Sequence, residues 1–295
     1  MPKIRLDVLL MERGLAESRS KAHALVMAGQ VRVNDQVALK PATAIDPKST
    51  LTVDHGPRFV SRGGEKLDAA LEAFAIDVKG LVCADVGAST GGFTDCMLQR
   101  GAEKVYAIDV GKGILHWKLR NYARVVVLEE TNARHLASLP GKVSFVTVDA
   151  SFISLKILLP VVKGWFDFPS PASRSEEIMD NKAEVLALIK PQFEAGKKDV
   201  ARGDGVIRDP EIHRQVLLDI LSFAKQQGFG LSGLIKSPLL GPKGNAEFLV
   251  WLDLYSEGRS VEELVNNTMK EEIARLPCAE HSAVQEVDGQ APSSQ

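Results

Sequence analysis

Four ionisable residues stand where predicted strands or helices begin or end, and together they have the composition of a catalytic site. Asp149 ends the apolar run VSFVTVD, Lys190 ends VLALIK, and Glu247 begins NAEFLVWL. Lys66 opens a helical segment before the first of these strands. Ligands of parallel α/β sheets bind outside the carboxyl ends of the strands. If the strand after Glu247 runs antiparallel, its start lies at the same edge, and all four side chains converge there.

Two lysines and two carboxylates suit methyl transfer to a weak oxygen nucleophile such as a ribose 2′-hydroxyl. This hydroxyl needs a base or strong polarisation, and a lysine serves as the base if its pKa falls from about 10.4 toward neutrality. Burial and a second cation favour that fall, while flanking carboxylates orient the amine. The alternative is that each of the four residues is an ordinary salt-bridge residue at the rim of a sheet.

The glycine-rich stretch DVGASTGGFTDC, residues 85–96, follows an apolar strand and leads into a helix. Backbone amides and a helix N-terminus therefore face an incoming ligand. The pattern D-x-G-x-x-x-G-G differs from the dinucleotide fingerprint G-x-G-x-x-G. A carboxylate at Asp85, placed at the mouth of the loop, would repel a pyrophosphate and attract an ammonium or a sulfonium. S-adenosylmethionine carries both cations; the alternative is a glycine-rich turn such as any α/β enzyme can have.

Residues further along the chain fit the adenosine half of the same cofactor. Asp109 ends the next apolar run, where a carboxylate can accept both ribose hydroxyls, and Asn132 follows the third run, in reach of an adenine edge. We therefore predict a cofactor site made of Asp85, Gly87, Ala88, Ser89, Thr90, Gly91, Gly92, Phe93, Asp109, Asn132 and Asp149.

The elements that must position these residues alternate along the chain. Short, β-branched apolar runs (LVCADVG, KVYAIDV, VSFVTVD, VLALIKP) alternate with helical segments such as TDCMLQRG and PEIHRQVLLDILSFAKQQG. This alternation predicts a doubly wound, mostly parallel α/β sheet. Only the loop SPLLGPKG separates GLSGLIKS from NAEFLVWLDL. These last two runs are therefore predicted to form an antiparallel hairpin at the edge of the sheet.

A smaller α-then-β module precedes the sheet. Residues 5–13 place Leu6, Leu9 and Leu10 on one helical face, and Ser18 is the predicted N-cap of a second helix. Residues 1–64 carry ten Lys/Arg against six Asp/Glu, a net charge of +4, although the whole chain has a net charge of −2. A basic module on a mildly acidic body indicates contact with a polyanion. Random scatter of charge in a short segment is the alternative.

The composition excludes several classes of protein. The chain has 295 residues, of which 45% are hydrophobic and 25% charged, which fits a soluble protein with one large and one small domain. It has no apolar run of about 18 residues, as a membrane helix requires, and its N-terminus does not resemble a signal peptide. Cys83, Cys96 and Cys278 are scattered, and the histidines also lack metal-like spacing. We predict a cytoplasmic protein without a metal.

The sequence also resembles a known family. RLDVLLMERGLAESRSKAHALVMAGQVRVN is similar to an S4 RNA-binding domain. SRGGEKLDAAL, DVGASTGGFTD, TVDASFISL and ALIKPQFEAG resemble the TlyA family, which joins an S4 domain to an FtsJ/RrmJ-like methyltransferase and also carries the name haemolysin A. The resemblance runs from about residue 3 to about residue 255, and its specificity comes from the motifs in combination.

The resemblance implies a Rossmann-like class I methyltransferase fold preceded by a small α+β S4 domain. It implies S-adenosylmethionine-dependent 2′-O-methylation of cytidine ribose in ribosomal RNA. Its catalytic Lys-Asp-Lys-Glu set falls on Lys66, Asp149, Lys190 and Glu247, the four positions reached above. We expect Lys190 to be the base or polariser of the hydroxyl. Some members have a tryptophan in the linker where this chain has Phe59, so the coupling of RNA docking to cofactor binding is in question here.

The same resemblance places RNA contacts on the S4 module and the linker, where cations position the protein on phosphates and make the affinity depend on salt. The loop GKKDVARGDG is expected to close over a flipped-out nucleotide, with a merely flexible loop as the alternative. The expected RNA contacts are Arg5, Arg19, Lys21, Arg32, Asn34 and Lys40 in the module, Arg58 and Arg62 in the linker, and Lys197, Lys198 and Arg202 in the loop.

The predicted organisation is an S4-like domain over 1–57, a linker over 58–65, a methyltransferase domain over 66–256, a C-terminal helix over 257–276 and a disordered tail over 277–295. The expected partner is ribosomal RNA within ribosomal subunits. Two other functions are alternatives. A non-catalytic RNA-binding or ribosome-assembly factor would not need S-adenosylmethionine, and a pore-forming haemolysin would need a membrane-active segment that the sequence does not offer.

Overall fold

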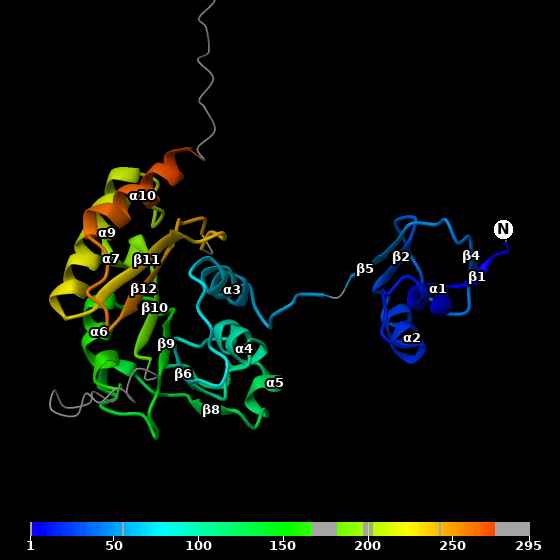
Figure 1. The fold of residues 1–295 in the computed structure, drawn as a ribbon, viewed down its shortest axis with the longest axis horizontal. Coiled ribbons are helices and arrows are strands. Elements are labelled where there is room, and N and C mark those ends of the chain that lie inside the picture. Colours follow the sequence, from blue (N-terminus) through cyan, green and yellow to red (C-terminus); the bar gives the residue numbers. More distant parts are fainter. Residues whose placement is uncertain are drawn as a thin grey trace, which may run out of the picture. The chain divides into compact units, whose positions relative to one another are not determined.

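The structure is a computed structural model that describes residues 2–54, 56–166, 182–196, 200, 203–241 and 243–274. The chain divides into two compact units, Met1–Gly64 and Glu65–Gln295 (Figure 1). The predicted tail over 277–295 lies outside the described residues, as do Lys197, Lys198 and Arg202.

The first unit is a small α+β domain with its own apolar core. Its elements are β1 (Ile4–Arg5), α1 (Leu6–Glu12), α2 (Arg19–Met27), β2 (Val31–Val33), β3 (Gln36–Val37), β4 (Ala44–Ile45) and β5 (Leu51–Val53). Ser18 caps α2 as predicted, because its hydroxyl accepts a hydrogen bond from the Lys21 amide at 3.2 Å. Leu6, Leu9 and Leu10 share one face of α1 and are buried against α2 and β2.

The second unit is built on one mixed sheet. Its strands are β6 (Val82–Val86), β7 (Lys104–Ile108), β8 (Val125–Leu128), β9 (Phe145–Val148), β10 (Glu184–Ile189), β11 (Gly230–Lys236) and β12 (Phe248–Asp253). Among the described residues the strand order is β11-β12-β10-β9-β6-β7-β8. The strands from β6 to β10 are parallel to one another, whereas β12 is antiparallel to both β10 and β11. The predicted doubly wound sheet and its antiparallel hairpin at one edge are confirmed.

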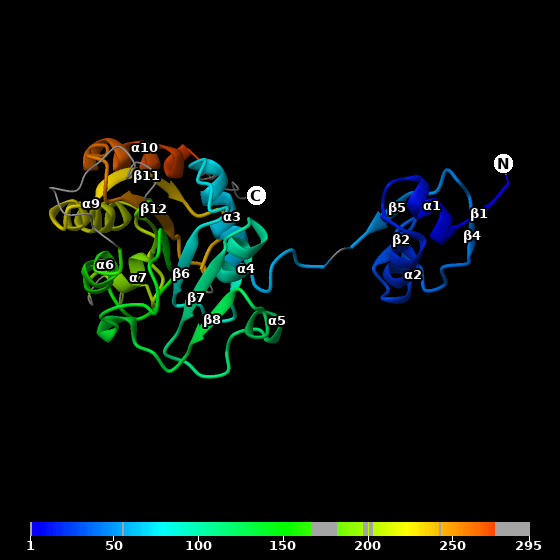
Figure 2. The same ribbon diagram turned by 60° about the horizontal axis from the view of Figure 1, so that its bottom comes forward.

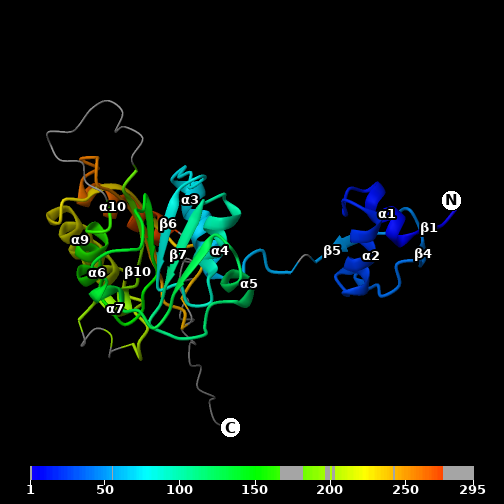
Figure 3. The same cartoon turned by 90° about the horizontal axis from the view of Figure 1, so that it is seen from below.

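Helices cover both faces of this sheet. Figures 1 and 3 show α6, α9 and α10 on one side and α3, α4 and α5 on the other. The bounds are α3 (Gly63–Ala73), α4 (Gly92–Gln99), α5 (Trp117–Arg120), the 3₁₀ helix η1 (Ala133–His135), α6 (Leu155–Lys163), α7 (Pro191–Glu194), α9 (Pro210–Gln226) and α10 (Val261–Ala274). Because both faces are covered, the central strands are mostly apolar, and every residue of β9 and β10 is buried.

The predicted catalytic and cofactor-binding residues lie at the edge of the sheet where the parallel strands end. The glycine loop follows β6, Asp109 follows β7, Asp149 follows β9, and Lys190 follows β10. Glu247 immediately precedes the antiparallel strand β12. Ile189 pairs with Phe248 in the β10–β12 ladder, so Lys190 and Glu247 take the next opposed position beyond the last pair. The topology therefore brings these residues to one edge of the sheet, although they are far apart in sequence.

Candidate active site

The loop between β6 and α4 needs glycine where it approaches the next strand end. Gly87 has φ +83°, and a Cβ at this position would stand 2.7 Å from the carbonyl oxygen of Asp149. Gly91 has φ +98° and is the N-cap of α4. Both angles lie in the region that side chains disfavour. The glycines thus allow the loop to pack against the end of β9 and leave the backbone amides at the start of α4 uncovered by side chains.

Asp85 does not stand at the mouth of this loop, contrary to the sequence prediction. Its side chain is fully buried and accepts hydrogen bonds from the hydroxyls of Thr94 at 2.7 Å and Thr147 at 3.0 Å. Burial raises the pKa of Asp85 to about 7, against the lowering effect of the two hydroxyls. This carboxyl therefore joins β6, β9 and α4, and it does not line the cavity next to the loop.

A cavity of about 290 Å³ lies above the loop, at the ends of β6, β7 and β9. Gly87 and Ser89 contribute to its wall, together with Asp109, Asn132 and Asp149. The Asp109 carboxylate accepts hydrogen bonds from the amides of Ser89 and Gly111, each at 2.8 Å, and so ties the glycine loop to the end of β7. The Asn132 side chain caps η1 by accepting from the Arg134 amide at 3.1 Å. With the Lys190 ammonium described below, the two carboxylates leave a net negative charge at this wall, which favours a ligand that carries positive charge.

Lys190 and Asp149 form an ion pair at this cavity. Lys190 Nζ lies 2.6 Å from Asp149 Oδ1 and donates a hydrogen bond to Ser151 Oγ at 3.0 Å. The lysine side chain is 10% exposed and the aspartate side chain 23%. Because Asp149 and Ser151 both line the cavity, the ammonium group is fixed at its border. A cation held in this way can donate a hydrogen bond to an oxygen that gains negative charge.

Lys66 pairs with Glu247 and not with the Lys190 group. Lys66 Nζ lies 2.5 Å from Glu247 Oε2, and the glutamate side chain is only 1% exposed. Lys66 belongs to the first turn of α3, so this pair joins the helix to the start of β12. Gly241 packs closely on the carboxylate, since a Cβ there would stand 2.5 Å from Glu247 Oε1. The four predicted residues thus form two separate lysine–carboxylate pairs.

Three residues beside the Lys190 pair were missed from the sequence: Ser151, Phe152 and Phe193. Phe152 has φ +64° and is 90% exposed, an unusual backbone conformation for an aromatic residue, with a cost of about 1–3 kcal/mol. Its ring centroid lies 4.9 Å from that of Phe193. Both rings border a second cavity of about 600 Å³, which Asp204 and Gly205 also line. Their position directly after Asp149 and Lys190, in DASF and KPQF, was the available signal.

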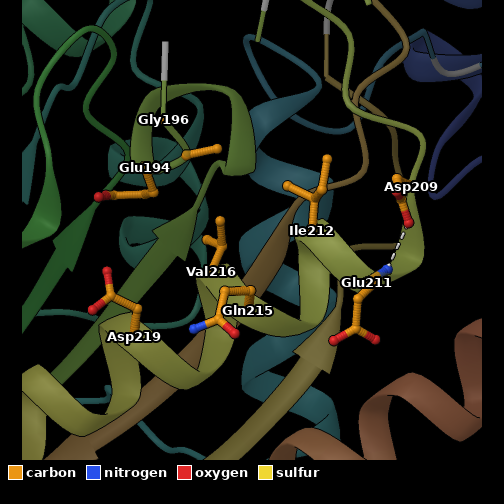
Figure 4. Close-up of a pocket in the computed structure, with 9 residues that line it drawn as sticks. Glu194, Gly196, Asp209, Glu211, Ile212, Gln215, Val216 and Asp219 are labelled. Atoms are coloured by element: carbon orange, nitrogen blue, oxygen red, sulfur yellow. Dashed lines mark hydrogen bonds between the residues drawn. The ribbon is translucent and has the colours of Figure 1, made fainter. Parts of the chain in front are cut away.

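A third cavity, of about 360 Å³, is acidic and lies between α7 and α9 (Figure 4). Three of its carboxylates already have partners. Glu194 accepts from Ser154 Oγ at 2.6 Å, Asp209 caps α9, and Asp219 pairs with Lys156 at 2.6 Å. Glu211 also lines this cavity, so its charge would repel a nucleic acid. We therefore infer that these carboxylates stabilise the fold and do not take part in the reaction.

The predicted RNA contacts that the structure describes are exposed: Arg5, Arg19, Lys21, Arg32, Asn34, Lys40, Arg58 and Arg62. Arg5 and Arg19 pair with the buried carboxylate of Asp7 at 2.9 and 3.1 Å. The hydrogen bonds from Arg5 hold the pKa of Asp7 well below its usual range. Asp7 therefore orients both guanidinium groups at the surface of the first unit. The Asn34 amide oxygen is occupied differently, because it accepts from the Thr50 amide at 2.9 Å.

The linker residue Phe59 is buried, and Arg58 stacks on its ring at 4.7 Å. A Cβ at Gly64 would collide with the Phe59 ring, so glycine makes room for the aromatic side chain. Among the described residues, no group of three or more His, Cys, Asp or Glu side chains is arranged to hold a metal ion. The helices in that part of the chain are all too short or too polar to cross a membrane.

Comparisons with known proteins add to this geometry. The FtsJ-like methyltransferase family matches residues 59–254, and the S4 domain matches residues 4–51. The 16S/23S rRNA (cytidine-2′-O)-methyltransferase TlyA of Mycobacterium tuberculosis is 45% identical over 277 residues, which are 91% of this chain and 98% of that protein. The chain belongs to the TlyA family of FtsJ-like methyltransferases.

Further TlyA-family relatives carry a different name. Hemolysin A of Brachyspira hyodysenteriae is 39% identical over 83% of this chain and 98% of its own length. A solved structure, "Putative hemolysin from Streptococcus thermophilus", has 40% sequence identity and a TM-score of 0.64, and covers 93% of this chain and 98% of that one. This TlyA-family methyltransferase therefore shares nearly its whole length with relatives of both names.

Proposed function

We propose that this enzyme transfers the methyl group of S-adenosylmethionine to the ribose 2′-hydroxyl of cytidines in ribosomal RNA. The observation that carries the proposal is the Lys190–Asp149 ion pair at the border of the cavity above the glycine loop. The printed name of the 45% identical relative supplies the substrate class. An FtsJ-like domain joined to an S4 domain fits an enzyme that modifies RNA.

The residues around the cavity fit this cofactor. The close approach of Gly87 to the Asp149 carbonyl keeps side chains out of the space above the loop. Asp109 is expected to hold the ribose hydroxyls and Asn132 the adenine edge. Asp109 and Asp149, rather than the buried Asp85, supply the negative wall that favours a cationic ligand. When bound, S-adenosylmethionine would supply a methyl carbon activated by its sulfonium.

Lys190 is the residue that would act on the methyl acceptor, the ribose hydroxyl. Asp149 and Ser151 hold its amine in place. Lys190 would donate a hydrogen bond to the ribose 2′-oxygen and stabilise the negative charge that develops there. The hydroxyl proton would pass to solvent water as the oxygen bonds to the methyl carbon, and the carbon–sulfur bond would break to leave a neutral thioether. The exposed ring of Phe152 stands between the cofactor cavity and the cavity next to Phe193. An unstacked base could pack against this ring, because bases extruded from RNA stack on aromatic side chains.

The exposed cations of the S4 unit are assigned to the RNA backbone. Arg5 and Arg19, held by Asp7, present guanidinium groups at fixed positions, which suits phosphate. A substrate made of ribosomal subunits would place the enzyme in the cytoplasm, as we propose.

The test is to incubate ribosomal subunits with the protein and S-adenosylmethionine that carries a labelled methyl group, and then to map the label by mass spectrometry. The proposal expects label on ribose 2′-oxygens of cytidines. Label on bases, or no label, would contradict it. A titration of the protein with S-adenosylmethionine separates the last case, because a non-catalytic assembly factor need not bind the cofactor.

A further inference from the structure

The segment from Val110 to Arg124 presents aromatic and basic side chains on the surface next to the cofactor cavity. Trp117 is 66% exposed, and Val110, Ile114 and Tyr122 are also among the exposed large apolar residues. The segment contains four Lys/Arg and no Asp/Glu. Apart from Val110, which borders the cavity, none of these side chains has a place in the site described above.

Trp117 and Tyr122 each have a cation over the ring. Lys118 Nζ lies 6.0 Å from the centroid of the Trp117 ring, and Arg124 Cζ lies 5.2 Å from that of Tyr122. The His116 ring lies 5.9 Å from the Trp117 ring at an interplanar angle of 29°, so the two rings are roughly parallel. Base stacking on aromatic rings, with nearby cations for the phosphates, is how proteins bind unpaired nucleotides.

The charges of this surface favour an anionic partner. Within the described residues, Lys118 and Arg124 form no ion pair with a carboxylate; Arg124 instead donates hydrogen bonds to the Ala102 carbonyl and the Tyr122 hydroxyl. Arg120 pairs with Glu129, and Lys112 with Glu130 at 2.9 Å. The charges of Lys118 and Arg124, each next to an aromatic ring, can therefore interact with an anionic partner. A protein partner with an apolar face would leave both of them without a counter-charge.

Hydrogen bonds and close packing connect this surface to the end of β8 and to the glycine loop. The Glu129 carboxylate accepts hydrogen bonds from the amides of Gly113 at 2.8 Å and Ile114 at 3.2 Å, and the first of these lowers its pKa to about 2. A Cβ at Gly91 would stand 2.8 Å from Leu115 Cδ1, so the segment packs on the N-cap of α4. Figures 2 and 3 both show α5 beside α4. A partner on Trp117 would therefore lie at a fixed position relative to the cofactor cavity.

We propose that Trp117, Lys118, Tyr122 and Arg124 form an RNA-binding surface of the methyltransferase unit, on which an unpaired nucleotide stacks against Trp117. The inference rests on the proposed function for the identity of the polymer. It extends that function with a second anchoring point, separate from the S4 unit, that holds the RNA strand beside the methyl-transfer site.

Tryptophan fluorescence of the full-length protein tests the proposal directly. Of the three tryptophans, Trp165 is buried and Trp251 is partly buried, so Trp117 is the one that RNA can reach. Adding transcribed ribosomal RNA without S-adenosylmethionine should quench the emission, and added salt should reverse the quenching. Trp117→Phe should remove the quenching and leave RNA affinity almost unchanged, because phenylalanine still stacks. The proposal is overturned if added RNA leaves the emission unchanged. It is also overturned if the emission changes with protein concentration alone, as contact with a second copy of the chain would cause.

Binding affinities supply the second readout. Trp117→Ala should weaken RNA binding about 5-fold or more, as the loss of one stacked base does. Lys118→Gln should lower the slope of log affinity against log salt by about one. The matched control is Tyr255→Ala, which removes a partly exposed aromatic residue after the end of β12. Tyr255 lies at the end of the sheet where the parallel strands begin, away from the cavity. Wild-type affinity in Trp117→Ala, or equal loss in the control, contradicts the proposal. These measurements omit methyl transfer, so they are independent of whether the proposed reaction is correct.

Discussion

The two lysine–carboxylate pairs at the carboxyl edge of the sheet have similar lengths but different surroundings. Lys66–Glu247 joins α3 to β12, and its glutamate is 1% exposed beneath Gly241. Lys190–Asp149 borders a cavity, and its aspartate is 23% exposed. A charge pair removed from water stabilises a structure only while both partners remain, whereas a pair that faces a cavity can exchange its contacts with a ligand. From this difference we propose that Lys66–Glu247 mainly stabilises the fold and that Lys190–Asp149 takes part in methyl transfer.

The largest effect is expected at the cavity pair. Lys190→Ala should lower the single-turnover rate of methyl transfer about 10²–10⁴-fold, the range for loss of a general acid–base or charge-stabilising group. The free energy of unfolding should change much less, because the Asp149 side chain is partly exposed at the cavity and not fully buried. Rapid-quench assays with labelled S-adenosylmethionine, beside urea unfolding, measure both quantities. A large loss of stability with little loss of rate would reverse the roles of the two pairs.

Substitution in the buried Lys66–Glu247 pair should mainly lower the free energy of unfolding. Glu247→Ala leaves the Lys66 ammonium without its counter-charge in a buried position, and the expected cost is about 3–5 kcal/mol in the free energy of unfolding. The double variant Lys66→Met with Glu247→Leu removes both charges and should recover most of this stability. Urea titrations of the wild type, the single variant and the double variant test this cycle. No recovery in the double variant would mean that packing around Glu247, and not its charge, is decisive.

Asp85 extends the comparison because it is a buried carboxyl that forms no ion pair with any residue that the structure describes. Its pKa of about 7 in the folded protein lies above the value of 3.8 for an exposed aspartate, so the folded state binds the proton more tightly. The free energy of unfolding should therefore fall as the pH rises from about 4 to about 7, by up to about 4 kcal/mol at about 1.4 kcal/mol for each pH unit. Asp85→Asn cannot ionise and should lack this contribution.

Urea unfolding at about pH 4.5 and about pH 7.5 measures the Asp85 contribution as the difference between the wild type and Asp85→Asn. The hydroxyls of Thr94 and Thr147 can rotate to suit the amide, so the variant is expected to fold. An identical pH dependence in both proteins would show that Asp85 is ionised in the fold throughout this range.

The smallest effect is expected at Ser151, whose neutral hydroxyl accepts a hydrogen bond from the Lys190 amine. Ser151→Ala removes the hydrogen bond of 3.0 Å while Asp149 remains in place. A neutral partner of this kind contributes about 1 kcal/mol, which corresponds to a roughly fivefold lower rate of methyl transfer. Steady-state kinetics should show the loss in kcat and not in the KM for RNA. A loss as large as that of Lys190→Ala would make Ser151 a participant in the reaction.

Local periodicity was sufficient to predict the main strands and helices and the edge at which the site lies. The N-cap at Ser18 and the antiparallel hairpin of β11 and β12 followed from residue types and from the short loop between two apolar runs. Placing Asp149 and Lys190 at one edge needed only the rule that parallel strands present their ends together. Glu247 also required the prediction that β12 runs antiparallel.

Contacts between distant segments were beyond the sequence pattern. Asp85 was expected at the loop mouth, but hydroxyls from Thr94 on α4 and Thr147 on β9 draw its side chain into the interior. The division of the four charged residues into two pairs depends on how α3 packs on β12, which no local signal records. Phe152 was missed because its positive φ and its contact with Phe193 are set by the folded loop.

The most direct test of the central claim, that the Lys190–Asp149 pair acts on a ribose hydroxyl, is a change in the substrate. Once the modified cytidine has been mapped, the same RNA can be assembled with 2′-deoxycytidine at that position. The account predicts unchanged RNA binding and no transfer of labelled methyl to the deoxy substrate. Continued transfer to that nucleotide would place the methyl group on the base and contradict the account.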